Sequence, residues 1–359
     1  MEASLMKRVW LDILTPKQFW YFRSVAGFLR DRGVELFVTS RNYEQVLPLL
    51  DNFGYCKVVV VGEFGGAGLR GKLLKSVERT AELLKVVGDF DRAVSSGSPE
   101  AARIAYGVGV PHILASDTPH SPVNKLTAPL SSSVLTPWVI NKREWTVHGV
   151  PPSKITHYRG LDPAAWLKNF TPEISVPRGM GLEPGGYVLV RSPEYKASYL
   201  LGSGWGLDDF YRFVVKLSEK MGRYRVVLLA RYGDEAMVFE DVKRENLTVV
   251  ERPVTGLSLL YYSAMFVGGG GTMTQEAALM GVPTVSIYPG RLPTVLRYLA
   301  EKKLVKHLKS RENLVDRVMG IADRLDIIRD FTVSRARRLL DRMENPAQRV
   351  AEAVLKTIA

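Results

Sequence analysis

The 359-residue chain has little cysteine and no long hydrophobic run, and these two shortages exclude several classes of protein. Cys56 is the only cysteine, so the chain can form neither an internal disulfide nor a cysteine-based metal cluster. The longest apolar runs, such as KVVVVG at 57–62, have the length of a strand and are too short to cross a bilayer. The N-terminus lacks the apolar segment and small-residue cleavage site of a secretory signal, so we expect a cytoplasmic protein.

Several chemical signatures are also missing. The sequence contains no H-E-x-x-H motif, no G-x-S-x-G motif and no cluster of metal ligands. Nucleophilic serine chemistry therefore has no support, and no metal site is expected. Zinc-finger spacings and aromatic-rich RNA-binding motifs are absent, which argues against nucleic acid as a partner.

Positive charge, in contrast, is in excess, with a formal net charge of +12. Such a charge favours anionic partners, namely phosphates, nucleic acid or an anionic membrane face. The densest basic run, SRARRLLDR at 334–342, has a helical pattern and is expected to be a solvated helix face. Charge alone therefore leaves phosphate-bearing ligands and peripheral membrane contact as the alternatives to consider.

The order of apolar runs predicts two Rossmann-like α/β domains with parallel sheets. Continuous Val/Ile/Leu runs indicate strands that are buried on both faces, with helices on each side of the sheet. The first half has strands at 8–14, 34–40, 57–62, 92–97, 111–116 and 133–137, and helices at 18–31, 43–52, 69–88, 98–107 and 121–130. The second half has strands at 187–192, 224–230, 247–251, 264–269 and 283–288, and helices at 207–220, 257–263 and 273–280.

A Pro/Gly-rich stretch at about 158–185 separates the two halves. We expect an N-terminal domain over 1–165, a linker over 166–185 and a C-terminal domain over 186–345. A last helix over 346–359, after the break at Asn345-Pro346, is expected to pack back on the N-terminal domain. In such a chain the ligand site is expected in the cleft between the domains, at the carboxyl ends of the strands.

The segment FVGGGGTMTQEAALMGVP, 266–283, places four glycines between a predicted strand and a helix. Backbone N–H groups and the positive end of the helix dipole meet at such a point, and glycines let a phosphate approach closely. Thr272 can cap the helix or bind the ligand, and Glu276 can accept hydrogen bonds from a ribose. A tight turn is the alternative, but four glycines exceed what a turn needs.

A second glycine segment, GAGLRGKL at 66–73, matches the spacing G-x-x-x-x-G-K of a P-loop. Leu73 stands where that loop needs Ser or Thr to hold magnesium, so an ATP-dependent phosphotransferase is a weak alternative.

Three loops of the first half, 15–20, 95–100 and 116–125, follow predicted strands and meet at one edge of the sheet. Asp117 and His120 lie in the last of them, and either can take a proton from a hydroxyl group. His120 has a structural loop role as its alternative. Ser98 and Glu100 fit a helix cap followed by an acid in the first turn, which is a structural role.

These features resemble the GT-B fold, as found in the N-acetylglucosaminyltransferase of peptidoglycan synthesis and in UDP-N-acetylglucosamine 2-epimerases. SSGSPEAARIAYGVGVP, NKLTAPL, YKASY, LLARYGDE and GGGGTMTQEAALMGVPTVSIYPG resemble more specifically a family of unknown function, common in archaea and described only as glycosyltransferase-like. This resemblance covers nearly the whole chain, and the last motif is the most specific.

The resemblance implies a donor site for a nucleotide-sugar, UDP-linked, in the C-terminal domain. Gly269, Gly270, Gly271 and Thr272 would hold the diphosphate and Glu276 the ribose. Backbone near Val254 would contact the base, and Arg191 and Arg231 would neutralise the phosphates without a metal. The N-terminal loops would face the acceptor, with these residues on that side: Lys17, Ser96, Gly97, Ser98 and Asn124.

The chain departs from the epimerases at two points. Pro122 stands where their catalytic Glu would be, and Arg191-Ser192-Pro193 replaces their His region. The sequence therefore favours sugar transfer, with Asp117 or His120 as the base and no tightly bound cofactor. The acceptor would be a glycan or a lipid-linked molecule. Core packing is the commoner role of an aromatic group such as FWYF at 19–22, but an exposed part of it could contact a lipid-linked acceptor or the inner membrane face. Epimerisation or hydrolysis of a sugar nucleotide, and binding without catalysis, remain the alternatives.

Overall fold

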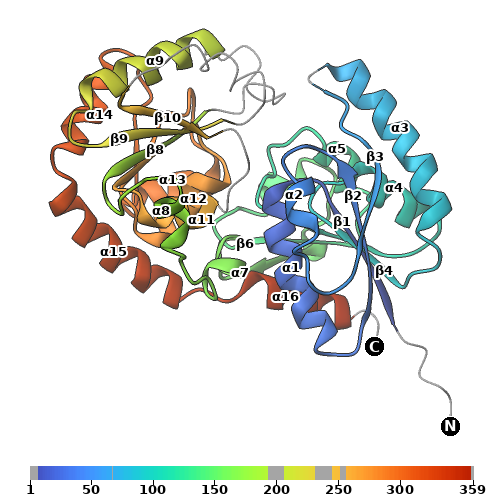
Figure 1. Cartoon of the computed structure of the whole chain (residues 1–359). Coiled ribbons are helices and arrows are strands. Elements are labelled where there is room, and N and C mark those ends of the chain that lie inside the picture. The colour runs from blue at the N-terminus through green and yellow to red at the C-terminus, as the bar shows by residue number, and fades with distance from the viewer. Residues whose placement is uncertain (1–6, 67, 193–205, 231–244, 251–255, 357–359) are drawn as a thin grey trace. The chain divides into compact units, whose positions relative to one another are not determined.

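The computed structural model describes residues 7–66, 68–192, 206–230, 245–250 and 256–356 (Figure 1). The chain divides into two compact units. The first comprises Met1–Lys168 together with Met343–Ala359, and the second comprises Asn169–Arg342. The second unit thus begins inside the segment expected as a linker, and that segment also contains a short helix, α8 (Ser175–Gly179).

The first unit is built on a seven-stranded parallel sheet in the order β3-β2-β1-β4-β5-β6-β7. Its strands are β1 (Arg8–Ile13), β2 (Glu35–Asn42), β3 (Val58–Glu63), β4 (Arg92–Ser95), β5 (His112–Ala115), β6 (Ser133–Pro137) and β7 (Ile155–Tyr158). Its helices are α1 (Pro16–Arg30), α2 (Leu47–Leu50), α3 (Leu69–Val86), α4 (Pro99–Gly107), α5 (Asn124–Thr127), α6 (Arg143–Thr146), α7 (Ala164–Leu167) and α16 (Pro346–Lys356), with a 3-10 turn at Pro152–Lys154. The C-terminal helix α16 packs against α1 and α7.

The second unit is built on a six-stranded parallel sheet in the order β10-β9-β8-β11-β12-β13. Its strands are β8 (Tyr187–Arg191), β9 (Arg225–Leu229), β10 (Leu247–Val250), β11 (Met265–Gly268), β12 (Thr284–Ser286) and β13 (Val305–His307). Besides α8, its helices are α9 (Leu207–Lys220), α11 (Gly256–Tyr262), α12 (Thr272–Met280), α13 (Thr294–Glu301), α14 (Leu314–Ala322) and α15 (Leu325–Asp341). The predicted α/β class with two parallel sheets is confirmed.

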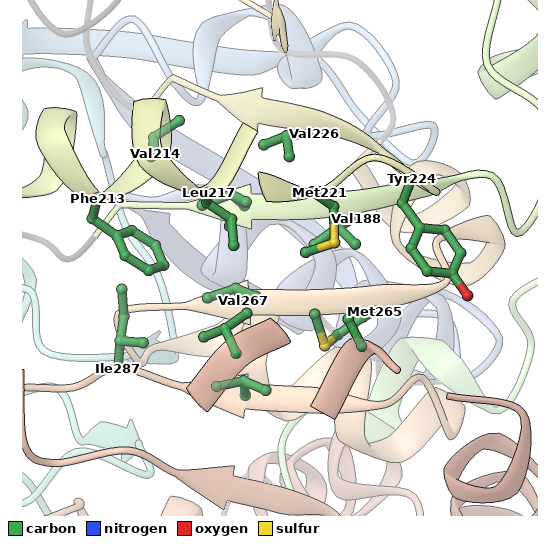
Figure 2. Close-up of a cluster of buried hydrophobic side chains, with 14 of the residues drawn as sticks. Val188, Phe213, Val214, Leu217, Met221, Tyr224, Val226, Met265, Val267 and Ile287 are labelled. Carbon is green, nitrogen blue, oxygen red and sulfur yellow. The ribbon is translucent and has the colours of Figure 1, made fainter. Parts of the chain in front are cut away.

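Burial on both faces of the second sheet explains why its strands are continuous apolar runs. Val188 and Val190 of β8 belong to one cluster, with Phe213 and Leu217 of α9 (Figure 2). Leu189 points to the opposite face and belongs to a second cluster. Because strand side chains alternate between faces, a run such as YVLV is needed to fill both layers.

Helix α1 begins where the sequence supplies a cap and a proline. The Thr15 hydroxyl accepts a hydrogen bond from the Gln18 backbone N–H, and Pro16 occupies the first turn. The buried face of this helix includes Phe19, Tyr21 and Phe22. These three rings fill the core, which is the commoner role of such a group, and Trp20 is the ring of the FWYF segment that stays partly exposed.

Two predicted helices are much shorter in the structure. The pattern at 43–52 contracts to α2, and that at 121–130 contracts to α5. Pro48 and Pro122 lie within these stretches, and a proline is tolerated only in a first helical turn. The sequence prediction also missed β7, a four-residue strand whose sequence ITHY has no apolar run. None of the described helices is long and apolar enough to cross a membrane.

Candidate functional site

Strand order marks one place in each sheet where a ligand site is expected. The order of strands reverses between β1 and β4 in the first unit, and between β8 and β11 in the second. The connections leaving the carboxyl ends of such neighbouring strands run in opposite directions and open a crevice. The segments that follow β1, β4 and β11 contain Lys17, residues 96–98 and the glycine run, whereas most of the segment after β8 lies outside the described residues.

The glycine run follows β11 directly and turns the chain into α12. Gly268 pairs with Arg191 in the sheet, and the Gly269 N–H donates to the Arg191 carbonyl at 3.3 Å. Gly270 and Gly271 have φ angles of +97° and +83°, a region that glycine adopts without strain.

Packing inside the protein explains two of the four glycines. A Cβ atom on Gly268 would lie 2.5 Å from the Phe266 ring, and one on Gly270 would lie 2.8 Å from the Tyr288 ring. A Cβ atom on Gly271 would meet no atom within 4 Å. The argument that four glycines exceed the needs of a turn therefore no longer rests on Gly268 or Gly270, whereas Gly271 has open space beside it.

The amino end of α12 carries no side-chain cap. Gly271 occupies the cap position and has no side chain that could accept hydrogen bonds from the first-turn N–H groups. Thr272 begins the helix and is half-buried, whereas Thr274 and Glu276 are buried. Within the described part of the chain, the Thr274 hydroxyl has no hydrogen-bond partner.

Arg191 ends β8 beside the glycine run. Its Nη1 atom donates to the carbonyls of Leu229 and Ala230, at 3.1 and 2.7 Å. These two bonds hold the guanidinium at the carboxyl edge of the sheet, against the end of β9. The other two residues expected to bind the nucleotide, Arg231 and Val254, lie outside the described residues.

In the first unit, Lys17 bridges two buried carboxylates. It lies on the first turn of α1 and forms ion pairs with Asp117, after β5, and with Asp162, after β7. The Lys17 Nζ to Asp162 Oδ2 distance is 2.7 Å, and the Tyr158 hydroxyl donates to Asp162 Oδ1 at 2.5 Å. Lys17, expected on the acceptor side, is thus bonded to the candidate base Asp117.

Burial controls the titration of this cluster. Burial and the nearby Asp117 carboxylate raise the pKa of Asp162 to about 6, although Lys17 and Tyr158 oppose the change. Burial by itself would lower the pKa of Lys17, but the two carboxylates outweigh it and raise that pKa. Lys17 therefore stays charged at neutral pH, and one ammonium serves two carboxyl groups.

Comparison with known proteins supplies the family. The model of the family described as "Protein of unknown function (DUF354)" matches residues 7–356. The chain is a member of the DUF354 family. Uncharacterized protein MJ0665 of Methanocaldococcus jannaschii is 26% identical over 318 residues, which cover 86% of this chain and 90% of that protein.

Solved structures share the fold of this DUF354 protein. The UDP-GlcNAc 2-epimerase of Methanocaldococcus jannaschii, in complex with UDP-GlcNAc and UDP, has a TM-score of 0.70 at 13% identity, covering 97% of this chain and 99% of that one. Spinosyn forosaminyltransferase SpnP has a TM-score of 0.66 at 15% identity, covering 99% and 100%. The DUF354 chain therefore has the GT-B-like two-domain fold that epimerases and glycosyltransferases share.

The other acceptor-side residues of the DUF354 chain hold its loops together. Gln18 joins two of these loops, because its Nε2 donates to the Ser96 carbonyl at 2.8 Å and its Oε1 accepts from the Leu14 N–H. Ser98 is buried and caps α4 by accepting from the Ala101 N–H at 3.1 Å.

Gly97 and Asn124 shape the loop after β4 and the one after β5. Gly97 has a φ of +85°, and a Cβ atom there would lie 3.3 Å from Val123. The buried Asn124 amide donates to the carbonyls of Thr118 and Pro119, at 2.7 and 3.3 Å. These residues thus support the backbone next to Asp117.

His120 lies on the exposed surface of the loop that carries Asp117. Burial of part of the ring lowers its pKa, and the Asp117 and Glu144 carboxylates offset some of the change. With Pro119, Asn141, Arg143, Glu144, Val147 and His148, His120 lines an open hollow of about 570 Å³. A neutral His120 at the edge of this hollow can accept a proton.

A second buried ionic cluster lies in the first unit. The Arg79 guanidinium contacts Asp12 Oδ1 at 2.6 Å and Glu100 Oε2 at 3.4 Å. Glu100 also accepts hydrogen bonds from Ser76 and Ser98, at 2.6 and 3.1 Å, so it does more than complement the α4 dipole. Burial raises the pKa of Asp12, but Arg79 outweighs that and lowers it below its usual range.

Sequence reasoning missed Asp162, Tyr158 and the Asp12–Arg79–Glu100 cluster. Tyr158 is the last residue of β7, and Asp162 follows that strand. Because the sequence pattern did not reveal β7, no signal marked these two residues as lying at the edge of the sheet. Among the residues described, no group of three or more His, Cys, Asp or Glu side chains is arranged to hold a metal ion.

Proposed function

We propose that this DUF354 protein is a GT-B-type glycosyltransferase that uses a UDP-linked sugar as donor. The acceptor is a glycan or a lipid-linked molecule with a free hydroxyl group. In this proposal the second unit binds the donor, and the first unit binds the acceptor and supplies the base.

The observation that carries the proposal is Gly271 at the amino end of α12. It has open space at its Cα, a positive φ, and a helix start without a side-chain cap behind it. Free N–H groups at the positive end of a helix dipole attract a diphosphate. The fold comparison supports the nucleotide, because solved proteins of this fold were captured with UDP and with UDP-GlcNAc.

Each charged group then has a role in the transfer. Asp117, held by Lys17, takes the proton of the acceptor hydroxyl, with His120 as the alternative base. The hydroxyl oxygen attacks the sugar C1 carbon, and UDP leaves with the electrons of the broken bond. Arg191 balances the charge that develops on the departing diphosphate.

Calorimetric titration with UDP, ADP and GDP tests the donor site. We expect UDP to bind the wild type most tightly and the Gly271→Ala variant at least about tenfold more weakly, since the new methyl group occupies the phosphate position. Glu276→Ala is expected to weaken the binding of nucleosides more than the binding of pyrophosphate. Absence of binding by any nucleotide would sink the proposal.

Gly185→Ala is the matched control for Gly271→Ala. Gly185 lies in the same unit, has a φ of +75° and likewise has no atom within 4 Å of its Cβ position. The two substitutions therefore impose similar backbone strain. Only Gly271→Ala is expected to lose nucleotide affinity; equal losses would assign the effect to strain.

Epimerisation of a sugar nucleotide is a second candidate function. The paired carboxyl groups of Asp117 and Asp162 favour it, because deprotonation and reprotonation of a sugar carbon need two acid–base groups. Incubation of UDP-GlcNAc without an acceptor separates the two functions. Epimerised sugar nucleotide or free N-acetylmannosamine would contradict the transfer proposal.

A further inference from the structure

Arg41 lies at an irregular end of β2, on the edge of the first sheet that carries the candidate site. The register between β2 and β3 shifts between Ser40 and Asn42, so that Arg41 faces two residues of β3, Val61 and Gly62, and lies opposite a β-bulge. Bulges interrupt the regular pairing of two strands and are frequent beside active sites. Because all the strands are parallel, Arg41 lies at the same carboxyl edge as Lys17 and Asp117.

Two aromatic rings support the Arg41 guanidinium. Its central carbon lies 5.0 Å from the centre of the Phe64 ring and 5.5 Å from the centre of the Tyr43 ring. Such stacking fixes the plane of the guanidinium and removes water from its sides while its edge stays free to donate hydrogen bonds.

No anionic side chain of the described residues contacts the edge of this guanidinium directly. Its Nε atom is buried without an acceptor, and across the described residues Arg41 donates no side-chain hydrogen bond and forms no ion pair. A partly buried cation normally pairs with a carboxylate, because leaving it unpaired costs free energy.

The neighbouring carboxylates are committed to another arginine. Asp12 and Glu100 act on Arg41 electrostatically, but Arg79 holds both of them in direct contact. Arg79 also repels Arg41, and burial with this repulsion lowers the pKa of Arg41 below its ordinary value. Arg41 thus has a fixed plane, unused donors and only distant counter-charges.

We propose that Arg41 binds the anionic group of a small ligand, a phosphate or a carboxylate, at the carboxyl edge of the first sheet. The fork of guanidinium donors matches two oxygens of such a group. This site lies in the first unit, and it requires neither the nucleotide site at Gly271 nor a transfer reaction.

Calorimetric titration with inorganic phosphate, and separately with acetate, tests the site in the full-length protein at low ionic strength. We expect Arg41→Gln to weaken phosphate binding by about tenfold or more, the usual effect of losing a charge-assisted pair, and Arg41→Lys to weaken it less. Comparison of the two anions shows whether the site prefers phosphate or carboxylate.

Arg23→Gln is the matched control. Arg23 also stacks over a ring, with its central carbon 5.9 Å from the centre of Tyr55, but its Nε donates to the carbonyls of Asn52 and Phe53. Its substitution is expected to leave phosphate binding unchanged. Phosphate could also bind at the glycine run. Such binding would be lost in Gly271→Ala and kept in Arg41→Gln, which distinguishes it from binding at Arg41.

Nuclear magnetic resonance localises the effect. The Arg41 Nε–H signal, identified by its disappearance in Arg41→Gln, is expected to shift during the phosphate titration. If this signal does not move and the affinity of Arg41→Gln equals that of the wild type, the proposal is overturned. A large fall in melting temperature of Arg41→Gln without any phosphate effect would instead make Arg41 a structural counter-charge for Asp12 and Glu100.

Discussion

The ammonium group of Lys17 lies 2.7 Å from a carboxylate oxygen of Asp162 and also pairs with Asp117, and both carboxylates are almost completely buried. Removal of the shared cation would leave two buried negative charges close together. We expect Lys17→Met to lower the free energy of unfolding by about 3 kcal/mol or more, as when one partner of a buried pair is lost. Urea denaturation at pH 7, followed by circular dichroism, measures this change.

Lys75→Met provides the comparison for that measurement. Lys75 pairs with Glu78 at 2.8 Å, but both side chains are well exposed. Exposed pairs contribute little to stability, so no measurable change is expected. If both variants lost equal stability, the burial argument for Lys17 would be wrong.

The raised pKa of Asp162 predicts a pH dependence of a definite sign. A carboxyl group titrates near 4 in an unfolded chain, and this one titrates at about 6 in the folded protein. Between these values the folded state binds more protons than the unfolded state, so the Asp162 contribution to stability falls as pH rises from about 4 to about 6. Asp162→Asn removes this contribution.

Calorimetric melting temperatures of wild type and Asp162→Asn, recorded from pH 4 to pH 7, check this prediction. The free energy of unfolding of the wild type, relative to that of the variant, is expected to decline over that range. The slope of this decline against pH should be no steeper than the binding of one proton allows. Asp323→Asn, at an exposed position, is expected to run parallel to the wild type. If the melting temperature of Asp162→Asn also runs parallel to that of the wild type, the raised pKa of Asp162 is refuted.

The sequence predicted the parallel sheets because their strands are buried on both faces, and YVLV of β8 is the plainest instance. It could not predict β7, whose four residues lie at a sheet edge and need not be apolar. Asp162 was missed for the same reason. The glycine run was recognised from the sequence, but the steric reasons for Gly268 and Gly270 are contacts with rings that no local pattern reveals.

The exposed side of α3 carries apolar side chains that could form the expected membrane contact. Leu69, Leu73 and Val77 follow at four-residue intervals and are 70, 66 and 61% exposed, with Arg70 and Lys72 beside them. If the positive charge of the chain acts on an anionic bilayer, these side chains supply the apolar contact that the buried rings of Phe19, Tyr21 and Phe22 cannot. We expect binding to vesicles of phosphatidylcholine with phosphatidylglycerol, and several-fold weaker binding for Leu73→Ser.

Vesicle co-sedimentation measures that binding, with Val147→Ser as the control. Val147 is 73% exposed in the same unit but lies on the segment after α6, so its loss is expected to have no effect. Both variants should melt like the wild type, because neither side chain is buried. If the same fraction of protein sediments with anionic vesicles and with pure phosphatidylcholine, this surface is not an anionic membrane contact. If instead the wild type is a dimer that Leu73→Ser dissociates, the surface serves self-association.

Thr274 and Thr332 offer a matched pair of buried hydroxyl groups. The Thr332 hydroxyl donates to the Gly281 carbonyl at 2.6 Å, whereas the Thr274 hydroxyl has no partner among the described residues. Replacement by Val keeps the shape and removes the hydroxyl. Thr332→Val is expected to cost about 1 kcal/mol because it leaves a carbonyl without its donor, and Thr274→Val is expected to be neutral or stabilising.

Nucleotide affinity then separates a structural from a functional role for Thr274. A buried hydroxyl retained without a partner lowers stability, so its presence beside Gly268 on the first turn of α12 favours a role in the bound state. We expect Thr274→Val to weaken UDP binding several-fold while the melting temperature is unchanged or raised, and Thr332→Val to show the reverse. Unchanged UDP affinity in Thr274→Val would remove this hydroxyl from the proposed donor site and leave Gly271 as its main support.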